Sequence, residues 1–283
     1  MNIARLRTAF ELVRYSANTL DIEPLTVIET NLYILKNDMQ FREMYLWGTI
    51  YGSVKDYHIA FGYQDDIVSG QIYFYTHNFL EWFEVPRASM KAKEITPYCT
   101  TLFQGDPELI INPLKGNDIY YNDLETEETK EDNSEELKEE DRLAATIHLI
   151  NEEAAIVPRG SMHKKQTGEV IPSTSFRGLT SACGGQLKSY QHFRIPHKKW
   201  NKILLERKDY NYAFDFLETI DNDIPQNFAW SHKYQKGGAL TILRPLYWPG
   251  MTFYHNINTP LHGFYYCGNG KKNIDVLFML EKM

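Results

Sequence analysis

Hydrophobic side chains recur every three or four positions along the first part of the chain. The first such run covers residues 3–13 and predicts an amphipathic helix that ends near Asn18. A second run covers residues 25–35, directly after Pro24, a residue that suits the first turn of a helix. The pattern therefore predicts two amphipathic helices that pack on each other or on a sheet.

Beyond residue 41 the pattern changes to runs that are rich in aromatic and β-branched residues. Such runs occupy residues 41–63, 72–86 and 239–255, and glycine or proline interrupts or ends each of them. Aromatic and β-branched side chains favour pleated sheets, whereas glycine and proline mark bulges and strand ends. These segments predict short strands, mainly antiparallel.

Three later segments carry less regular patterns. Residues 154–172 are typical of a strand, a Pro-Arg-Gly turn and a second strand. Residues 264–267 and 274–280 flank a glycine-rich turn, which predicts a hairpin whose second strand lies in the core. The apolar positions within residues 214–220 predict a short helix.

The stretch from residue 121 to residue 140 is rich in acidic residues and poor in apolar ones. Between Asn122 and Arg142, eleven acidic residues against three basic ones give a net charge of −8, so the rest of the chain is near +1. Such a segment buries too little apolar surface to offset its ordering entropy, which predicts a solvated acidic loop. An acidic docking arm is the functional alternative. Residues 142–155, which follow the acidic stretch in the sequence, predict a short helix.

These patterns together predict an α+β protein. An N-terminal helical pair is followed by predominantly antiparallel β structure that a long acidic loop interrupts. The expected division is an N-terminal helical segment, a β-rich first part, the acidic loop and a β-rich second part, in one continuous globular unit. Their boundaries are residues 1–40, 41–120, 121–142 and 143–283. This pattern is compatible with one hydrophobic core or with two. The sequence has no internal repeat that would support a solenoid or a propeller.

Composition narrows the class of partner. The chain of 283 residues carries a net charge of −7, but its body outside the acidic stretch is nearly neutral and has no basic stripe. Nucleic acids and anionic membranes are therefore not expected as partners, because both need clustered Lys and Arg. Aromatic residues make up 14% of the chain, which favours β structure and protein interfaces.

The sequence also indicates an intracellular compartment. Its first residues mix charged and apolar side chains, so they do not resemble a signal peptide, and no apolar run is long enough to span a bilayer. The three cysteines, Cys99, Cys183 and Cys267, are odd in number and far apart. They fit reduced thiols better than a disulfide framework.

No metal or cofactor site is predicted. The cysteines form no paired motif of the kind that holds zinc. His192 and His197 lie five positions apart, and His255 and His262 seven apart, so neither pair has the spacing of a helical metal motif. Residues 268–272 read GNGKK, but they lack the remaining positions of a phosphate-binding loop and favour a hairpin turn.

No catalytic residue is predicted either. Ser161 follows a glycine but lacks the second glycine of a nucleophile elbow. Two carboxylate pairs, at residues 65–66 and 221–223, lie among polar residues in turn-like contexts. Aspartate side chains commonly bond their own backbone in turns, so turn formation explains both pairs better than acid–base catalysis.

Seven segments together resemble one family, the radial spoke head protein 9 family of motile cilia. They span nearly the whole chain in the family's order, with a longer acidic stretch, a larger segment before Ser189 and three extra C-terminal residues as departures. The segments are LWGTIYGSVKDYHIAFG (46–62), FQGDP (103–107), AAIVPRG (154–160), SYQHFRIP (189–196), DFLETIDNDIP (215–225), LRPLYWPGMTFYH (243–255) and GNGKKNIDVLFML (268–280).

The resemblance implies a non-enzymatic structural subunit of the radial spoke head in the axoneme of cilia and flagella. Such a subunit would support the related head proteins 4 and 6 and help to pass central-pair signals that regulate dynein-driven motility. Self-association within the head is compatible with this role. The resemblance implies no catalytic, cofactor-binding or metal site.

Two hypotheses from different classes follow. A structural subunit predicts an exposed apolar patch of more than a few hundred Å². A small-ligand-binding protein or hydrolase instead predicts a deep pocket with converging polar groups. Six aromatic residues are candidates for the interface, and at least half of them are expected to belong to the core, because aromatic strands bury one face; they are Trp47, Trp82, Trp230, Trp248, Phe253 and Tyr254.

Overall fold

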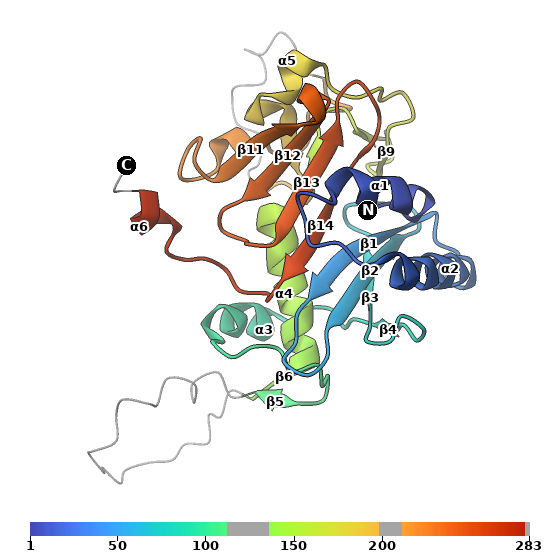
Figure 1. Ribbon diagram of the computed structural model, residues 1–283, viewed down its shortest axis with the longest axis vertical. Helices are drawn as coiled ribbons and strands as arrows, with labels where there is room; N and C mark the ends of the chain where they lie inside the picture. The colour runs from blue at the N-terminus through green and yellow to red at the C-terminus, as the bar shows by residue number, and fades with distance from the viewer. Residues whose placement is uncertain (112–135, 198–210, 281–283) are drawn as a thin grey trace.

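The computed structural model describes residues 1–111, 136–197 and 211–280. Its centre is an eight-stranded sheet in the order β11-β12-β13-β14-β1-β2-β3-β4 (Figure 1). All neighbouring strands are antiparallel except the central pair β1 and β14. The strands are β1 (Glu43–Ile50), β2 (Tyr57–Tyr63), β3 (Ile72–Thr76), β4 (Phe83–Glu84), β11 (Trp230–Gln235), β12 (Leu240–Pro245), β13 (Met251–Asn256) and β14 (His262–Gly268).

Helices cover both faces of this sheet. One face carries the N-terminal pair α1 (Leu6–Val13) and α2 (Ile22–Asp38), and the other carries α4 (Glu139–Ala154) (Figure 1). The remaining helices are short, namely α3 (Met90–Ile95), α5 (Ser181–Gly184) and α6 (Val276–Leu280). The predicted α+β class, the helical pair and the mainly antiparallel sheet are thus confirmed.

Three two-stranded sheets complete the described part of the chain. They pair β7 (Ile156–Pro158) with β10 (Tyr190–His192), β5 (Ile110–Ile111) with β6 (Leu137–Lys138), and β8 (Met162–Lys164) with β9 (Val170–Pro172). The two strands predicted within residues 154–172 are present as β7 and β8, on either side of the Pro-Arg-Gly turn.

Two large hydrophobic clusters lie on opposite faces of the single sheet. Neighbouring residues of β1 divide between them: Leu46 packs toward α1 and α2, whereas Trp47 packs toward α4. This alternation follows from the two-residue period of a strand. A β-bulge in β1 lies between Leu46 and Gly48, where an added Cβ would be 2.1 Å from the Tyr266 carbonyl oxygen. The two faces therefore share one sheet, with a glycine where β1 and β14 approach most closely.

The predicted C-terminal hairpin is wrong. Residues 273–280 leave the sheet after β14 and form the short helix α6. The Asn273 side chain accepts the backbone N–H of Asp275 at 3.1 Å, a local bond that favours a helical turn over a strand. Among the described side chains of residues 273–279, only Val276 is buried, while Ile274 and Phe278 are 74% and 71% exposed. The apolar run that we assigned to the core thus lies largely at the surface.

Two other expectations need correction. Residues 214–220 form no α-helix; a single 3₁₀ turn, Ile220–Asn222, takes its place. Residues 137–142 do not belong to the predicted acidic loop, because residues 137–138 form β6 and α4 already begins at Glu139. Residues 112–135, where most of the predicted loop falls, lie outside the described residues, and the four-part division of the chain stays a prediction.

Candidate functional site

The seven segments quoted above lie far apart in the chain, yet the fold gathers them along α4. Five of them form a hydrogen bond with a residue of α4; these are residues 46–62, 103–107, 189–196, 243–255 and 268–280. Residues 154–160 begin at the last residue of α4, and residues 215–225 are joined to it through Arg194. We call this set of contacts the α4 junction.

A buried carboxylate anchors the first turn of the α4 junction. Glu139 is completely buried and accepts the backbone N–H groups of three consecutive residues, Gln104, Gly105 and Asp106, at 2.9, 2.7 and 3.2 Å. The Tyr57 hydroxyl donates a further hydrogen bond at 2.8 Å. Successive amides that point at one anion form a nest, and the N-terminal end of the helix adds favourable potential. Glu139 therefore ties the FQGDP loop to the start of α4.

Arg142 continues the same contact one turn later. Its guanidinium lies 4.3 Å from the centroid of the Phe103 ring and donates to the Thr101 carbonyl oxygen at 2.7 Å. Burial lowers the pKa of Arg142, and the nearby Glu139 carboxylate partly offsets that effect. Arginine keeps its charge in such settings, so a buried cation and a buried anion together hold residues 101–106 against the helix.

The GNGKK loop closes the α4 junction from the other side. The Gly270 N–H donates to the Tyr266 hydroxyl at 2.9 Å, and a Cβ at Gly270 would lie 2.9 Å from the Phe103 ring. Lys271 donates to a backbone carbonyl, and Lys272 pairs with Glu153 at 2.6 Å. The loop's polar groups thus bond to the protein itself, which gives no support to the phosphate reading.

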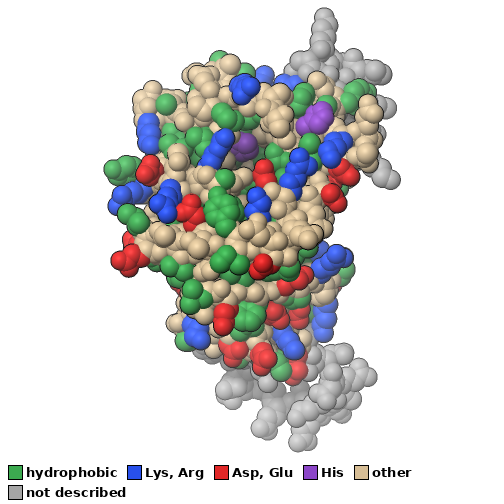
Figure 2. All heavy atoms as spheres, turned by 90° about the vertical axis from the view of Figure 1, so that its right-hand side faces the viewer, with side chains coloured by type: hydrophobic (Ala, Val, Ile, Leu, Met, Phe, Trp, Pro, Cys, Tyr) green, Lys and Arg blue, Asp and Glu red, His purple; other side chains and the backbone are tan. Residues whose placement is uncertain are grey.

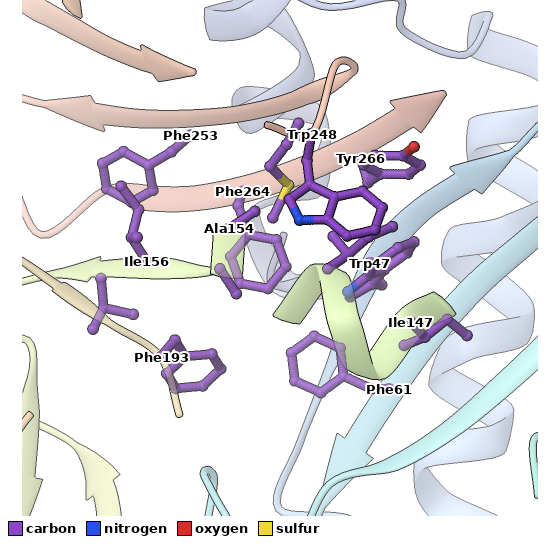
Figure 3. Close-up of a cluster of buried hydrophobic side chains, with 14 of the residues drawn as sticks. Trp47, Phe61, Ile147, Ala154, Ile156, Phe193, Trp248, Phe253, Phe264 and Tyr266 are labelled. Carbon is purple, nitrogen blue, oxygen red and sulfur yellow. The ribbon is translucent and has the colours of Figure 1, made fainter. Parts of the chain in front are cut away.

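Two tryptophans hold the last turn of α4. The indole N–H of Trp47 donates to Asn151 at 2.7 Å, and that of Trp248 donates to Glu153 at the same distance. Figure 3 shows both indoles among the aromatic side chains packed beside α4. Each indole is buried with its single donor satisfied, which fixes the orientation of the ring.

A cavity of about 570 Å³ opens at the C-terminal end of the α4 junction. Charged side chains of both signs line it, and most of them pair with one another. Lys272 contacts Glu153 at 2.6 Å, and His197 contacts Glu152 at 2.8 Å. Because these charges are already matched, the cavity offers little net field to a charged small ligand.

His192 and Asp223, which the sequence had placed in separate groups, meet in this cavity. The His192 Nε2 atom lies 2.9 Å from the Asp223 carboxylate, which also accepts the indole N–H of Trp230 at 2.7 Å. A hydrolase would use the other ring nitrogen to activate a hydroxyl or thiol. Among the described residues, Nδ1 of His192 has no hydrogen-bond partner. The observed contacts give this pair the role of a tie between residues 189–196 and 215–225.

Comparison with known proteins gives matches along the whole chain. A Xenopus tropicalis protein named Radial spoke head protein 9 homolog is 37% identical over 286 residues, which cover 99% of this chain and 100% of the relative. Proteins of the same name from Bos taurus and Homo sapiens are each 34% identical, with the same shares covered. The chain belongs to the radial spoke head protein 9 family. No family model matches the chain.

Membership of the radial spoke head protein 9 family confirms the resemblance that the seven segments carried. The α4 junction gives that resemblance a physical meaning. Segments that looked like independent motifs are joined to α4 by hydrogen bonds and ring contacts. Examples are the bonds of Glu139 with residues 104–106 and of Trp248 with Glu153. In this member of the family they specify how α4 is held on the sheet.

The aromatic candidates of the interface lie mostly inside the molecule. Trp47, Trp230, Trp248, Phe253 and Tyr254 are buried, and only Trp82 is partly exposed. The expectation that at least half belong to the core is confirmed, and the interface reading of the five buried ones is wrong. Because helices cover both faces of the sheet, aromatic residues that point to either face are buried. Aromatic character alone therefore did not identify an exposed interface.

Two elements expose apolar side chains instead. Val27 and Ile34 lie two turns apart on α2, and Asn31 between them donates to the Phe79 carbonyl oxygen at 2.9 Å. The turn that follows exposes Leu80. The C-terminal residues 274–279 form the second group. That either group forms a patch of more than a few hundred Å² stays a prediction.

The remaining residues singled out in the sequence have structural surroundings. Asp66 accepts backbone N–H groups two and three positions ahead, as predicted for a turn. Ser161 donates to the Pro158 carbonyl oxygen at 2.6 Å. The three cysteines are unpaired. Within residues 1–111, 136–197 and 211–280, no cluster of His, Cys, Asp and Glu could hold a metal ion, and no helix there is long and apolar enough to cross a bilayer.

His255 and His262 face each other across β13 and β14, so the sheet register brings this sequence pair together. His255 is fully buried, and burial lowers its pKa to about 4. His58, buried against the N-terminal helices, has its pKa lowered to about 4 for the same reason. Both rings are therefore neutral at physiological pH, which suits packing rather than ion binding.

Acid is expected to destabilise the fold through these two histidines. In the unfolded chain each titrates near pH 6.5 and in the folded chain near pH 4, so the unfolded state binds more protons in between. Their contribution is intact above pH 6.5 and falls as the pH drops toward 4, by up to about 1.4 kcal/mol per pH unit for each ring. Urea unfolding between pH 7 and pH 5 measures this slope, which should decrease in His255→Gln. An unchanged slope would contradict the assignment.

Proposed function

We propose that the chain is a non-enzymatic structural subunit of the radial spoke head in the axoneme of motile cilia and flagella. There it supports assembly of the head and helps to pass signals from the central pair toward the regulation of dynein. The observation that carries the proposal is the similarity over 99% of the chain to proteins named Radial spoke head protein 9 homolog.

The contacts of the α4 junction support a structural role. Its buried charges, Glu139 and Arg142, bond to backbone groups and to a ring, and the charges at its far end pair with one another. Catalysis instead needs groups that are aimed at a substrate with tuned titration. A subunit that transmits force needs a body whose segments are cross-tied, and α4 provides such ties at both of its ends.

The expected partners are other spoke head proteins, relatives of head proteins 4 and 6, with the central-pair projections as indirect partners. Self-association within the head is part of the same proposal. No cofactor, nucleic acid or membrane is expected. We assign these contacts to two surfaces, the exposed apolar residues of α2 and those of the C-terminal segment 274–279. Assembly would bury these apolar side chains and so remove them from water.

A second candidate is a small-ligand-binding protein or hydrolase, favoured only by the cavity of about 570 Å³ that holds His192 and Asp223. Its size lies within the range of ligand pockets, about 300 to 1,000 Å³. The variant His192→Ala separates the two candidates. If the chain is a structural subunit, the variant should still localise to the axoneme. If the chain is a hydrolase, the variant should lose turnover, and no axonemal localisation is expected.

The test of the proposed function is recovery of the tagged chain from demembranated cilia at low salt, followed by native mass spectrometry. We expect a stable complex with other spoke head subunits. Matched cilia that express the tag alone provide the control. A free monomer that is absent from axonemes would overturn the proposal.

A further inference from the structure

A second cavity, of about 490 Å³, shares no lining residue with the cavity at the end of α4. It is bounded by the first residues of the chain, the start of β1, the segment after β9 and the start of β14. These elements lie at the right of Figure 1, the side that Figure 2 turns toward the viewer. We call it the arginine pocket for the residues on its rim.

Aromatic rings form the floor of the arginine pocket. The rings of Tyr45 and Phe61 stack with centroids 5.0 Å apart, and Phe61 stacks in turn on Phe264 at 6.4 Å. Phe176 forms part of the wall and meets His262 edge to face at 5.7 Å. Such a floor offers contact to an apolar side chain.

Three arginines stand on the rim: Arg5, Arg42 and Arg177. All three are exposed, and they come from three separate parts of the chain. None of their side chains has a hydrogen bond or an ion pair with the described residues. Elsewhere in the described chain, Arg7, Arg159 and Arg194 each pair with a carboxylate. The rim is therefore a local excess of unpaired positive charge in a chain whose net charge is negative.

The pocket lining includes one acidic residue, Glu43, so its three arginines leave a net charge of +2 there. The Glu43 Oε2 atom accepts the Asn2 side-chain amide at 3.0 Å and the Tyr45 hydroxyl, which holds this carboxylate beside the floor. In Figure 2, Lys and Arg side chains are frequent over the upper half of this face, whereas Asp and Glu gather over its lower half.

We infer that the arginine pocket binds an acidic segment of a partner protein, with one apolar side chain on the aromatic floor and carboxylates on the three arginines. Charge complementarity selects the partner's chemistry, because guanidinium groups recognise carboxylates. The apolar floor favours a peptide over a free phosphate, which has nothing to place there. A nucleic acid would need a longer basic stripe than three arginines provide.

Binding of a defined probe to the intact chain tests this inference. The probe is a fluorescein-labelled peptide of about 12 residues, extended over the rim, in which glutamate alternates with leucine or phenylalanine. One comparison peptide replaces every glutamate by lysine, and another replaces every apolar residue by serine. Fluorescence anisotropy gives the affinity of each peptide, and anisotropy at rising salt reports how much of it is electrostatic.

We expect the acidic apolar peptide to bind, the two comparison peptides to bind at least about tenfold more weakly, and the affinity to fall with salt. The triple variant Arg5→Gln, Arg42→Gln and Arg177→Gln should lose about tenfold or more. A control with the same change in charge, Arg14→Gln, Lys91→Gln and Lys233→Gln, alters exposed residues outside the pocket and should stay within about twofold.

The experiment is independent of spoke head assembly, because it uses the isolated chain. All six substituted residues are exposed, so both variants should fold, and circular dichroism verifies this. Equal binding of the lysine peptide, or equal losses in the two triple variants, would overturn the inference. Binding to phosphatidylserine vesicles without binding to the peptide would also overturn it and assign the pocket to a lipid surface.

Discussion

Replacing Glu139 by alanine is expected to lower the free energy of unfolding by about 3 to 5 kcal/mol. The change removes a completely buried carboxylate and leaves the N–H groups of Gln104, Gly105 and Asp106 without their acceptor. It also leaves Arg142 buried without the neighbouring negative charge. Urea unfolding followed by circular dichroism measures the loss.

The matched control is Glu136→Ala, an exposed carboxylate at the same end of α4. Its cost should stay within about 0.5 kcal/mol, because exposed charges contribute little. Glu139→Gln should fall between the two, since an amide oxygen can accept some of these bonds while its NH₂ group faces donors. If Glu136→Ala and Glu139→Ala cost the same, the carboxylate nest does not hold the FQGDP loop.

This residue also shows where sequence reasoning failed. Glu139 lies in a run of acidic residues, and the composition of that run predicts solvation. The structure separates it from the run, because α4 begins there and points its first carboxylate at a loop more than thirty positions earlier in the chain. A signal was present: the helical spacing of Leu143, Ile147 and Ile150 extends back to position 139 and places it on the buried face. Charge outweighed periodicity in the prediction.

The positions of the strands were easier to predict from the sequence than the way in which distant strands and side chains pair. Aromatic and β-branched runs located β1, β2, β3, β12 and β13, because a strand's composition reflects local burial. The pairing of β1 with β14 joins residues more than 200 positions apart, and no local pattern encodes it. For the same reason the meeting of His192 with Asp223 and the convergence of three arginines on one pocket could not be read from spacing.

The C-terminal run illustrates the opposite error. Residues 274–280 are apolar enough for a core strand, yet residues 276–280 form a helix just after the bond between the Asn273 side chain and the Asp275 N–H, and most side chains of residues 274–279 are exposed. Hydrophobicity predicts that a segment avoids water, and it does not say whether the cover comes from the same chain or from a partner. In a subunit of a larger assembly a partner can supply this cover, and for that reason we assign this segment to the partner surfaces.

The second large effect is expected at the last turn of α4, where Trp47→Ala should cost about 3 to 5 kcal/mol of unfolding free energy. Trp47 is completely buried, tilts against Tyr266 with ring centroids 5.3 Å apart, and donates to Asn151 at 2.7 Å (Figure 3). Alanine would leave a cavity under α4 and an unpaired amide oxygen. Chemical unfolding measures the loss, and reduced recovery in the spoke head complex should accompany it.

Two further variants separate packing from hydrogen bonding at this position. Trp47→Phe keeps much of the ring but removes the indole donor, so its cost should be about 1 to 3 kcal/mol, the range for a buried partner left unpaired. Trp82→Ala removes an indole that is only partly buried and should cost less than Trp47→Ala. Equal losses at the two tryptophans would contradict this role of Trp47, because stability then would not depend on how deeply each indole is buried. A loss confined to Trp47→Ala, with Trp47→Phe near wild type, would assign its role to packing against α4 alone.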